Sequence, residues 1–356
     1  MALFKDILGA EETLFKNPVA LDPDFMPKEI PYRENEQHYI ADCIKPLFKK
    51  RNGRNLIVTG APGIGKTAAC KHILQDLEKE TDEIYTIYVN CWNKNTTYKI
   101  ILELCEALGY RFTQNKKTEE LFGIVKGMLN KKSAVLVFDE IDKMEEFDFL
   151  YTFVEEIYRK TVVMITNYKE WITDLDQRIK SRLIPDTLEF KPYKPGEIRG
   201  ILEQRMKAAF FDGIWQGEAF DIVVEKTAET GDVRTGLFLM REAGSAAEEE
   251  SKRSITIEHV KKATSRMQGF SIKKDSELEE STKEILELVK SNPDMRIGEL
   301  FKRYQKDGGA LTYKSFQRRI QKLAENKFIS VKKLMGGKDG TTTIVKPFEH
   351  KKLTEF

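Results

Sequence analysis

Short apolar runs alternate with amphipathic stretches along the first 190 residues of the chain. The segments between the runs carry apolar residues at helical spacing, and a helix is also predicted over 33–51. Strands that alternate with helices are typical of a parallel sheet covered on both faces. The pattern therefore predicts a three-layer α/β domain that ends near Lys191. The runs predicted as strands are 56–59, 84–89, 134–138, 162–166 and 187–190.

After Pro195 the pattern changes to helices alone. Apolar stripes at helical spacing predict a small helical bundle. Residues 269–280 are polar and charged, and we interpret them as a linker or as the start of the next helix. The predicted helices of the bundle are 197–211, 218–229, 233–250 and 257–267.

The last segment has a different order of elements. Three short helices, at 282–290, 297–304 and 313–325, precede two strands at 328–331 and 342–345. A glycine-rich segment, 336–340, closes the hairpin between the strands. Three helices followed by a hairpin describe a winged helix. The sequence thus predicts three domains, a core over 1–191, a lid over 192–268 and a winged helix over 269–356.

The composition is that of a soluble, highly charged protein, with 40% hydrophobic and 33% charged residues among 356. No apolar run approaches the roughly 18–20 residues of a membrane span, and the N-terminus lacks a secretory signal. We therefore expect a cytoplasmic protein without a membrane partner. Four scattered cysteines without C-x-x-C spacing are expected to be mostly buried thiols, and they argue against a zinc site.

The net charge of +2 conceals a strong asymmetry. Residues 295–356 hold 15 Lys/Arg against 6 Asp/Glu, whereas the rest of the chain holds 44 against 51. A basic C-terminal module on an acidic body indicates a polyanionic partner at that end.

Residues 60–67 fit the G-x-x-x-x-G-K-[ST] pattern of a phosphate-binding loop, between a predicted strand and a predicted helix. Backbone N–H groups of such a loop cradle phosphates, and the helix N-terminus also favours an anion. Lys66 would reach the β and γ phosphates of ATP, and Thr67 would hold Mg²⁺. The residues expected to bind ATP or ADP here are Gly60, Pro62, Gly63, Ile64, Gly65, Lys66, Thr67 and Ala68.

Asp139 and Glu140 follow the buried strand 134–138, at the end where open α/β sheets bind ligands. Asp139 is expected to hold Mg²⁺, and Glu140 to orient and deprotonate the attacking water. The alternative is an acidic pair that caps a helix beginning at Ile141. The phosphate loop about 75 residues upstream favours the catalytic interpretation.

Three further polar residues have two interpretations each. Asn167 ends a strand, where it either contacts the γ-phosphate or the lytic water, or is an ordinary strand-terminating residue. Arg182 either stabilises transition-state charge on a neighbour's ATP or is a solvated helix residue. Arg234 begins a helix of the bundle, and a cation at a positively polarised N-terminus suggests an anionic partner.

The order of these motifs resembles that of AAA+ ATPases, and more narrowly that of the archaeal origin-recognition initiators, relatives of eukaryotic origin-recognition and licensing ATPases. The resemblance covers residues from about 11 to about 350. It implies that Asn167 is sensor 1, Arg234 sensor 2 and Arg182 an arginine finger, with all three catalytic beside Lys66, Asp139 and Glu140.

Other segments carry the same resemblance. Residues 31–37 match the family's segment near the adenine, and Lys191-Pro192-Tyr193 followed by Arg205 matches the Tyr and Arg that line its nucleotide pocket. Residues 89–108 resemble the helical insertion that touches DNA in initiators.

The helix 313–325 supports DNA binding independently. Phe316, Ile320 and Leu323 recur at helical spacing and should face the core, which leaves a polar, basic outer face. Such a helix fits a major groove, where Arg reads guanine and Gln reads adenine, while Lys338 at the hairpin tip would reach an adjacent groove. The alternative is a solvated basic face on a protein-binding winged helix. The outward residues are Lys314, Ser315, Gln317, Arg318, Gln321 and Lys322.

Together these features predict an ATP-dependent replication initiator that binds double-stranded origin DNA through its winged helix and its AAA+ insertion. Slow ATP hydrolysis would serve as a switch. A replicative helicase and further copies of the chain on DNA are the other expected partners. One alternative is a clamp-loader-like remodelling ATPase, which the Pro62-Gly63 form of the loop permits and the basic winged helix argues against. The other is a nucleotide-sensing transcription regulator.

Overall fold

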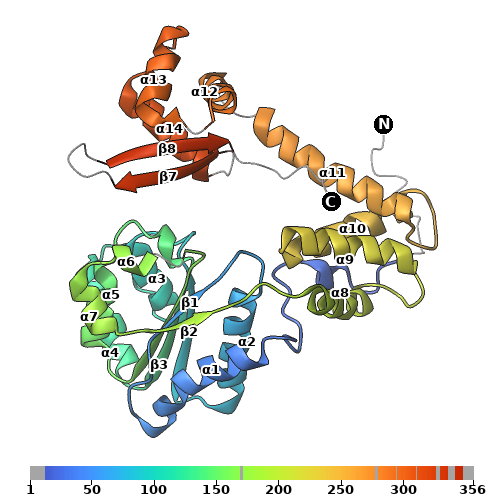
Figure 1. Ribbon diagram of the computed structural model, residues 1–356. Coiled ribbons are helices and arrows are strands. Elements are labelled where there is room, and N and C mark those ends of the chain that lie inside the picture. The colour runs from blue at the N-terminus through green and yellow to red at the C-terminus, as the bar shows by residue number, and fades with distance from the viewer. Residues whose placement is uncertain are drawn as a thin grey trace. The chain divides into compact units, whose positions relative to one another are not determined.

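A computed structural model describes residues 13–168, 171–276, 280–293, 295–309, 311–325, 329–335 and 341–347 (Figure 1). The chain divides into two compact units, residues 1–264 and 265–356, which are described separately below.

A five-stranded parallel sheet forms the centre of the first unit, with the strand order β2-β3-β4-β1-β5. All five predicted strands are confirmed, and the fourth begins two residues earlier than predicted, at Lys160. The strands are β1 (Leu56–Thr59), β2 (Ile84–Asn90), β3 (Ser133–Asp139), β4 (Lys160–Ile165) and β5 (Asp186–Glu189).

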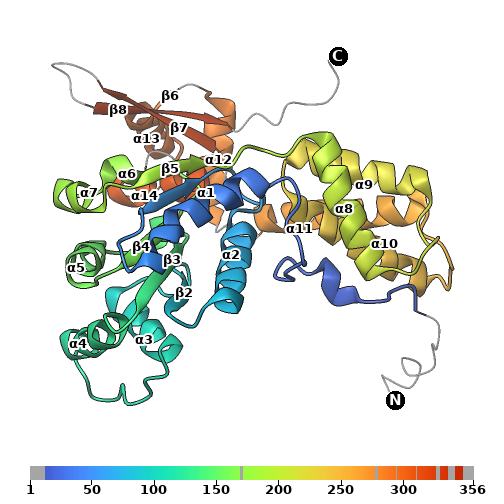
Figure 2. The same ribbon diagram turned by 90° about the horizontal axis from the view of Figure 1, so that it is seen from below.

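Side chains that alternate along the four strands β1 to β4 enter two separate cores. Helices therefore cover both faces of the sheet, which gives the three layers that the sequence predicts (Figures 1 and 2). On one face, Val135 and Val137 pack with α1 (Glu34–Ile44) and α2 (Lys66–Glu80). On the other face, Leu136 packs in a core formed with a larger set of helices. These are α3 (Thr97–Ala107), α4 (Thr118–Leu129), α5 (Asp148–Glu156) and α7 (Gln177–Leu183), beside the short α6 (Trp171–Asp174) and the 3₁₀ turn η3 (Ile141–Lys143).

The helix predicted over 33–51 is wrong at its C-terminal end. The α-helix α1 ends at Ile44, and the chain continues as a 3₁₀ turn, η2 (Lys45–Lys49). Pro46 lacks a backbone N–H, and its ring would clash with the carbonyl four residues earlier, so it cannot lie inside an α-helix. Lys50 then adopts a left-handed conformation with φ of 55°, which reverses the chain before β1.

The helical bundle is confirmed and contains α8 (Pro195–Ala209), α9 (Gly217–Thr230), α10 (Val233–Glu249) and the first part of α11 (Ile257–Ser276). The N-terminal segment packs against this bundle. The N–H groups of Lys16 and Asn17 donate to the carbonyl of Ala209 at 2.8 and 3.0 Å, just before the 3₁₀ turn η1 (Pro18–Leu21). The Phe15 ring lies 4.7 Å from that of Phe210.

The linker interpretation of residues 269–280 is wrong as far as Ser276, because α11 continues to that residue. The alternative, the start of the next helix, fits only the end of this range, since α12 begins at Glu280. Among residues 269–276 only Gly269 has a low intrinsic helix propensity, and polar or charged residues do not break a helix. Polarity alone therefore does not identify a linker.

In its described residues, the second unit contains the end of α11, three further helices and a three-stranded antiparallel sheet of order β6-β8-β7. These elements follow the order from which the sequence analysis predicted a winged helix. The short β6, which the sequence analysis missed, pairs through only two residues. Phe316, Ile320 and Leu323 are each at most 2% exposed, as their spacing predicts. The predicted hairpin segment 336–340 lies outside the described residues. The elements are α12 (Glu280–Ser291), β6 (Met295–Arg296), α13 (Ile297–Lys306), α14 (Tyr313–Glu325), β7 (Ile329–Met335) and β8 (Thr341–Pro347).

Two predictions from composition concern the whole chain. In the described ranges, no helix combines the length and the apolar character needed to cross a bilayer. The four cysteines, at positions 43, 70, 91 and 105, are all buried and carry free thiols.

Ile184 provides a test of backbone strain. It follows the last residue of α7 with φ of 37° and ψ of 58°, and it is 78% exposed. A left-handed conformation costs an L-residue about 1–2 kcal/mol, and for a β-branched residue it is a clear outlier. We expect Ile184→Gly to raise the free energy of unfolding by about 1 kcal/mol, because glycine adopts this conformation readily.

Urea-induced unfolding of the full chain measures this effect. Ile184→Ala is the control, since it removes the same exposed apolar atoms but keeps the Cβ, and it should gain less. A glycine variant no more stable than the alanine variant would show that the backbone is not strained here.

Candidate active site

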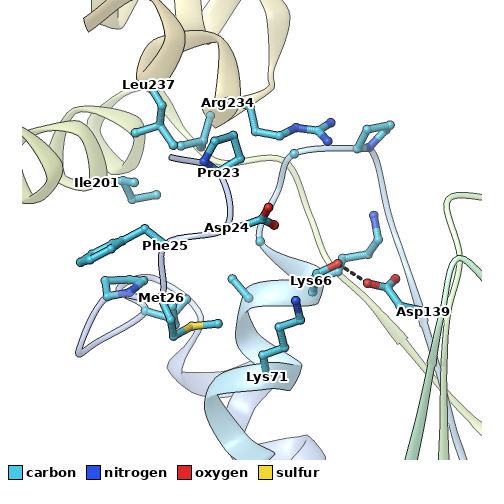
Figure 3. Close-up of a pocket in the computed structure, with 18 of the residues that line it drawn as sticks. Pro23, Asp24, Phe25, Met26, Lys66, Lys71, Asp139, Ile201, Arg234 and Leu237 are labelled. Carbon is cyan, nitrogen blue, oxygen red and sulfur yellow. Dashed lines mark hydrogen bonds between the residues drawn. The ribbon is translucent and has the colours of Figure 1, made fainter. Parts of the chain in front are cut away.

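The order of the strands brings the predicted motifs together. β4 lies between β1 and β3, with Val58 opposite Ile165 and Phe138 opposite Met164. The phosphate loop follows β1, Asp139 ends β3, and the segment with Asn167 follows β4, so all three meet at one edge of the sheet. A cavity of about 350 Å³ opens at this edge and extends to the helical bundle (Figure 3).

Lys66 connects two of these motifs. Its ammonium group donates hydrogen bonds to the carbonyls of Gly60 and Ala61, at 2.8 and 2.7 Å, and to Asn167 Oδ1 at 2.8 Å. Burial lowers the pKa of Lys66 to about 8. Lys66 is only 6% exposed, and these three hydrogen bonds hold its ammonium group in the cavity wall.

Asp139 accepts two hydrogen bonds at one carboxylate oxygen. Its Oδ2 receives the hydroxyl of Thr67 at 2.6 Å and the hydroxyl of Tyr88 at 2.7 Å. Thr67 and Asp139 were predicted to hold Mg²⁺ together, and their oxygen atoms fit that ion, which prefers hard oxygen ligands.

Glu140 has an unusual backbone and an unusual environment. Its φ of 52° is left-handed, a conformation that is uncommon for non-glycine residues. Burial, and next the negative charge of Asp139, raises the pKa of Glu140. A carboxylate with a raised pKa is a better proton acceptor, as a general base requires.

The bundle contributes the start of α10 to the cavity. Asp232 caps this helix, since its Oδ1 accepts the N–H of Arg234 at 2.9 Å. The guanidinium of Arg234 donates to both carboxylate oxygens of Asp232, at 2.7 to 3.1 Å. The N–H of Val233 donates to the carbonyl of Gly63 at 3.3 Å, so the bundle and the phosphate loop are in direct contact.

The sequence analysis did not predict the apolar wall of the cavity, which comes partly from the N-terminal segment. Pro23, Phe25 and Met26 line it, opposite Ile201 and Leu237 of the bundle (Figure 3). An apolar wall of this kind is what a planar base requires.

Arg205 lines the same cavity, but its hydrogen bonds go to the N-terminal segment. It donates to the carbonyl of Ala20 at 3.2 Å and to that of Phe25 at 3.1 Å, with its guanidinium 5.1 Å from the Phe25 ring. Arg205 therefore holds the apolar wall in place.

Arg33, from the segment predicted to lie near the adenine, supports the phosphate loop from its buried side. It is 4% exposed and donates to the carbonyls of Ile64 and Lys191 at 3.2 and 2.6 Å. Its guanidinium lies 3.9 Å from the Tyr193 ring. A Cβ at Gly65 would come 2.7 Å from the Tyr193 hydroxyl, so Gly65 lets that ring approach the loop.

Three predicted site residues do not line the cavity. Gly60 contributes only its carbonyl, to Lys66, and the side chain of Ile64 is buried in the core between sheet and α2. Arg182 lies on α7, half exposed, with its guanidinium 2.7 Å from Glu155 Oε1. The other residues predicted for the nucleotide site all line the cavity: Pro62, Gly63, Gly65, Lys66, Thr67, Ala68, Asp139, Glu140, Asn167, Tyr193, Arg205 and Arg234.

Tyr88, Asn90 and Lys71 also line the cavity and were missed. Lys71 lies over the Tyr88 ring, with 4.4 Å between its Nζ and the ring centroid. A signal for each exists in the sequence. Tyr88 and Asn90 are two residues apart on a strand and therefore share a face, and Lys71 follows Thr67 by about one helical turn.

In the second unit, the outer face of α14 is as polar as predicted. Lys314, Gln317, Arg318 and Gln321 are exposed. Ser315 is half buried, and it makes hydrogen bonds within its own helix turn. Its N–H donates to Thr312 Oγ1 at 3.3 Å, and its side-chain Oγ accepts the Thr312 hydroxyl at 3.1 Å. The side chain of Lys322 and the whole of Lys338 lie outside the described residues.

Comparison with known proteins agrees with this architecture. Residues 49–167 match the model of the AAA domain family, and residues 199–265 match that of the Cdc6 AAA+ ATPase-type lid domain. The chain is 31% identical over 327 residues to the ORC1-type DNA replication protein 1 of Sulfolobus acidocaldarius, covering 86% of this chain and 82% of that protein. It is 28% identical over 360 residues to the ORC1-type DNA replication protein 2 of Methanosarcina mazei, covering 96% and 95%.

A solved structure of the Aeropyrum pernix ORC1 protein in complex with DNA is similar over 95% of this chain and 94% of that one, with a TM-score of 0.75 and 26% identity.

The fold and the site define an AAA+ ATPase. The chain belongs to the family of ORC1-type DNA replication proteins. This assignment supports a role in replication initiation and favours it over a clamp-loader-like ATPase or a transcription regulator.

Arg205 gives a test of the cavity wall. Arg205→Ala leaves two carbonyls of the N-terminal segment without their donor, and each such loss costs about 1–3 kcal/mol. We expect a destabilisation of about 2–4 kcal/mol in urea unfolding, together with faster proteolysis of the N-terminal segment.

Arg205→Lys is the matched control, because it keeps the charge but not the forked donor geometry. It should recover part of the loss. Unchanged stability of the alanine variant would mean that the two hydrogen bonds do not hold the segment.

Proposed function

We propose that this chain is an ATP-regulated replication initiator that binds double-stranded origin DNA. The observation that carries the proposal is a cavity in which Lys66, Asp139 and Asn167 face Arg234 of the bundle, in a chain whose C-terminal unit presents a basic helix. In this proposal the chain has three domains, a nucleotide-binding core over 1–191, a lid over 192–268 and a winged helix over 269–356.

ATP or ADP is the ligand that this cavity fits. The base lies against the apolar wall, and the N–H groups of the loop with Lys66 hold the phosphates. Mg²⁺, when bound by Thr67 and Asp139, neutralises charge on the phosphates. Glu140 accepts a proton from the attacking water, Asn167 positions that water, and Arg234 contacts the γ-phosphate.

Arg182 acts on a different molecule in this proposal. It lies outside the cavity of its own chain, and its exposed guanidinium is bound only by Glu155 among the contacts described above. An arginine in this position serves as a finger when a second copy, assembled on DNA, brings its own nucleotide to α7. Hydrolysis is therefore slow in the isolated chain and acts as a switch between two long-lived states.

DNA binding is assigned to the exposed face of α14, with the insertion 89–108 as a second contact. The similar Aeropyrum pernix protein was solved in complex with DNA, which supports this assignment. Arg318 and Gln317 are placed to read bases, and Lys314 to neutralise phosphate. A chromosomal site occupied in this way would locate the protein at the nucleoid and recruit the replicative helicase there.

The nucleotide site is tested by a pair of variants. We expect Lys66→Ala to abolish ATP binding, because it removes the charge that holds the phosphates. Glu140→Gln keeps the shape and the binding but should lower the ATPase rate by about 10²-fold or more, since it removes the proton acceptor. Isothermal titration and phosphate release measure the two effects, and tight ATP binding by the Lys66 variant would refute the site.

The DNA site is tested by footprinting on origin and random duplexes, with and without ATP. Arg318→Ala should weaken origin binding by about 1–3 kcal/mol while leaving random-sequence binding nearly unchanged, if Arg318 reads a base. Lys314→Ala is the control, expected to weaken both equally and to reduce the salt dependence. Equal, weak and salt-sensitive binding of the wild-type protein to both duplexes would contradict origin recognition.

A further inference from the structure

The carboxylate of Asp232 lies directly against the phosphate loop. A Cβ built on Gly63 would come 1.9 Å from Asp232 Oδ1 and 2.2 Å from its Cγ. Gly63 has φ of 72°, so glycine is favoured there by the backbone as well as by the contact. A fixed negative charge thus stands beside a loop whose N–H groups are built to hold negative phosphates.

The only strong cation beside Asp232 in the described contacts is Arg234. Their ion pair is bidentate, and the Asp232 side chain is 26% exposed against 53% for Arg234. Arg234 also lines the same cavity as Lys66 and Glu140. Arg234 therefore lies beside the part of the cavity proposed to hold the γ-phosphate, but its guanidinium is paired with the Asp232 carboxylate.

Helix capping explains part of this arrangement. Asp232 caps α10 through its Oδ1, but asparagine and serine cap a helix about as well as aspartate does. Capping therefore requires a short polar side chain at this position and does not require a charge. The charge itself has its effect on Arg234 and on the loop.

We propose that Asp232 is a specificity-determining residue that competes with the γ-phosphate of ATP for Arg234, and so sets the preference for ATP over ADP. This inference rests on the proposed nucleotide site. ATP recruits Arg234 by displacing it from Asp232, which lowers the net gain from the γ-phosphate contact. ADP has no γ-phosphate and leaves the Arg234–Asp232 pair intact.

The exchange also connects the nucleotide to the lid. Once Arg234 turns to the γ-phosphate, Asp232 stands uncompensated beside the loop. The Val233 N–H bond to the Gly63 carbonyl joins the start of α10 to the same loop. Repulsion between the carboxylate and the bound phosphates then acts on the N-terminus of α10, at the point where the lid contacts the core.

Asp232→Asn is the test, because it keeps the cap and the size of the side chain and removes the charge. An exposed ion pair contributes about 0.2–1 kcal/mol, so the affinity for ATP relative to ADP should rise about 1.4- to fivefold. Isothermal titration with a non-hydrolysable ATP analogue and with ADP measures the ratio. Asp232→Ser, which also caps, should shift the ratio in the same direction.

The double variant Asp232→Asn/Arg234→Ala isolates the pair. In the Arg234→Ala background, Asp232→Asn should shift the ATP-to-ADP affinity ratio less than it does in the wild-type background, because only the direct repulsion between the carboxylate and the phosphates is then removed. An unaltered ratio in the Asp232→Asn single variant, or a shift that is just as large without Arg234, would overturn the competition. Failure of the wild-type protein to bind either nucleotide would instead refute the proposed nucleotide site, so the two failures are distinguishable.

Discussion

The contact between the phosphate loop and the start of α10 is the constraint on which the site depends. The loop belongs to the sheet domain and α10 to the helical bundle, and they meet where Asp232 packs on Gly63. Glycine is required there because any side chain would occupy the space of the carboxylate. Through this contact the carboxyl edge of the sheet and the apolar wall form one cavity, and Arg234 is placed above the loop (Figure 3).

Two buried arginines stabilise the walls of that cavity, and of the two only Arg205 lines it. Arg33 is buried behind the loop and holds the Ile64 carbonyl, while Arg205 holds the N-terminal segment against the bundle. Both arginines are buried and donate to carbonyl groups, and Arg33 also pairs with the Glu36 carboxylate at 2.9 Å. In contrast, Arg182 and Arg234 are half exposed, as is suitable for side chains that exchange partners.

The sequence allowed the sheet and most of the site to be predicted, because both depend on local patterns. Strand, loop and helix follow each other within a few residues of Lys66, and a parallel sheet places the ends of its strands at one edge. The errors came where one residue outweighs a pattern, as when Pro46 ends α1, or where a pattern has no structural meaning, as in the polar stretch of α11.

Long-range contacts could not be predicted from local patterns. Nothing near Gly63 in the sequence indicates that Asp232 packs on it, and nothing near Arg205 indicates that its partners are Ala20 and Phe25. Tyr88 could be predicted in part. Its spacing from Asn90 shows that the two side chains lie on the same face of the strand, but it does not indicate the hydrogen bond from Tyr88 to Asp139. Such contacts are fixed by how the bundle and the N-terminal segment pack on the sheet.

The central claim is that the γ-phosphate is detected where the loop meets the lid, and single-molecule energy transfer across that contact tests it most directly. Because the four native cysteines are buried, dyes can be attached to cysteines introduced at the exposed Glu80 on α2 and Glu225 on α9. The account predicts different distance distributions with a non-hydrolysable ATP analogue and with ADP, and loss of that difference in Arg234→Ala. Identical distributions with the two nucleotides bound to the wild-type protein would contradict it.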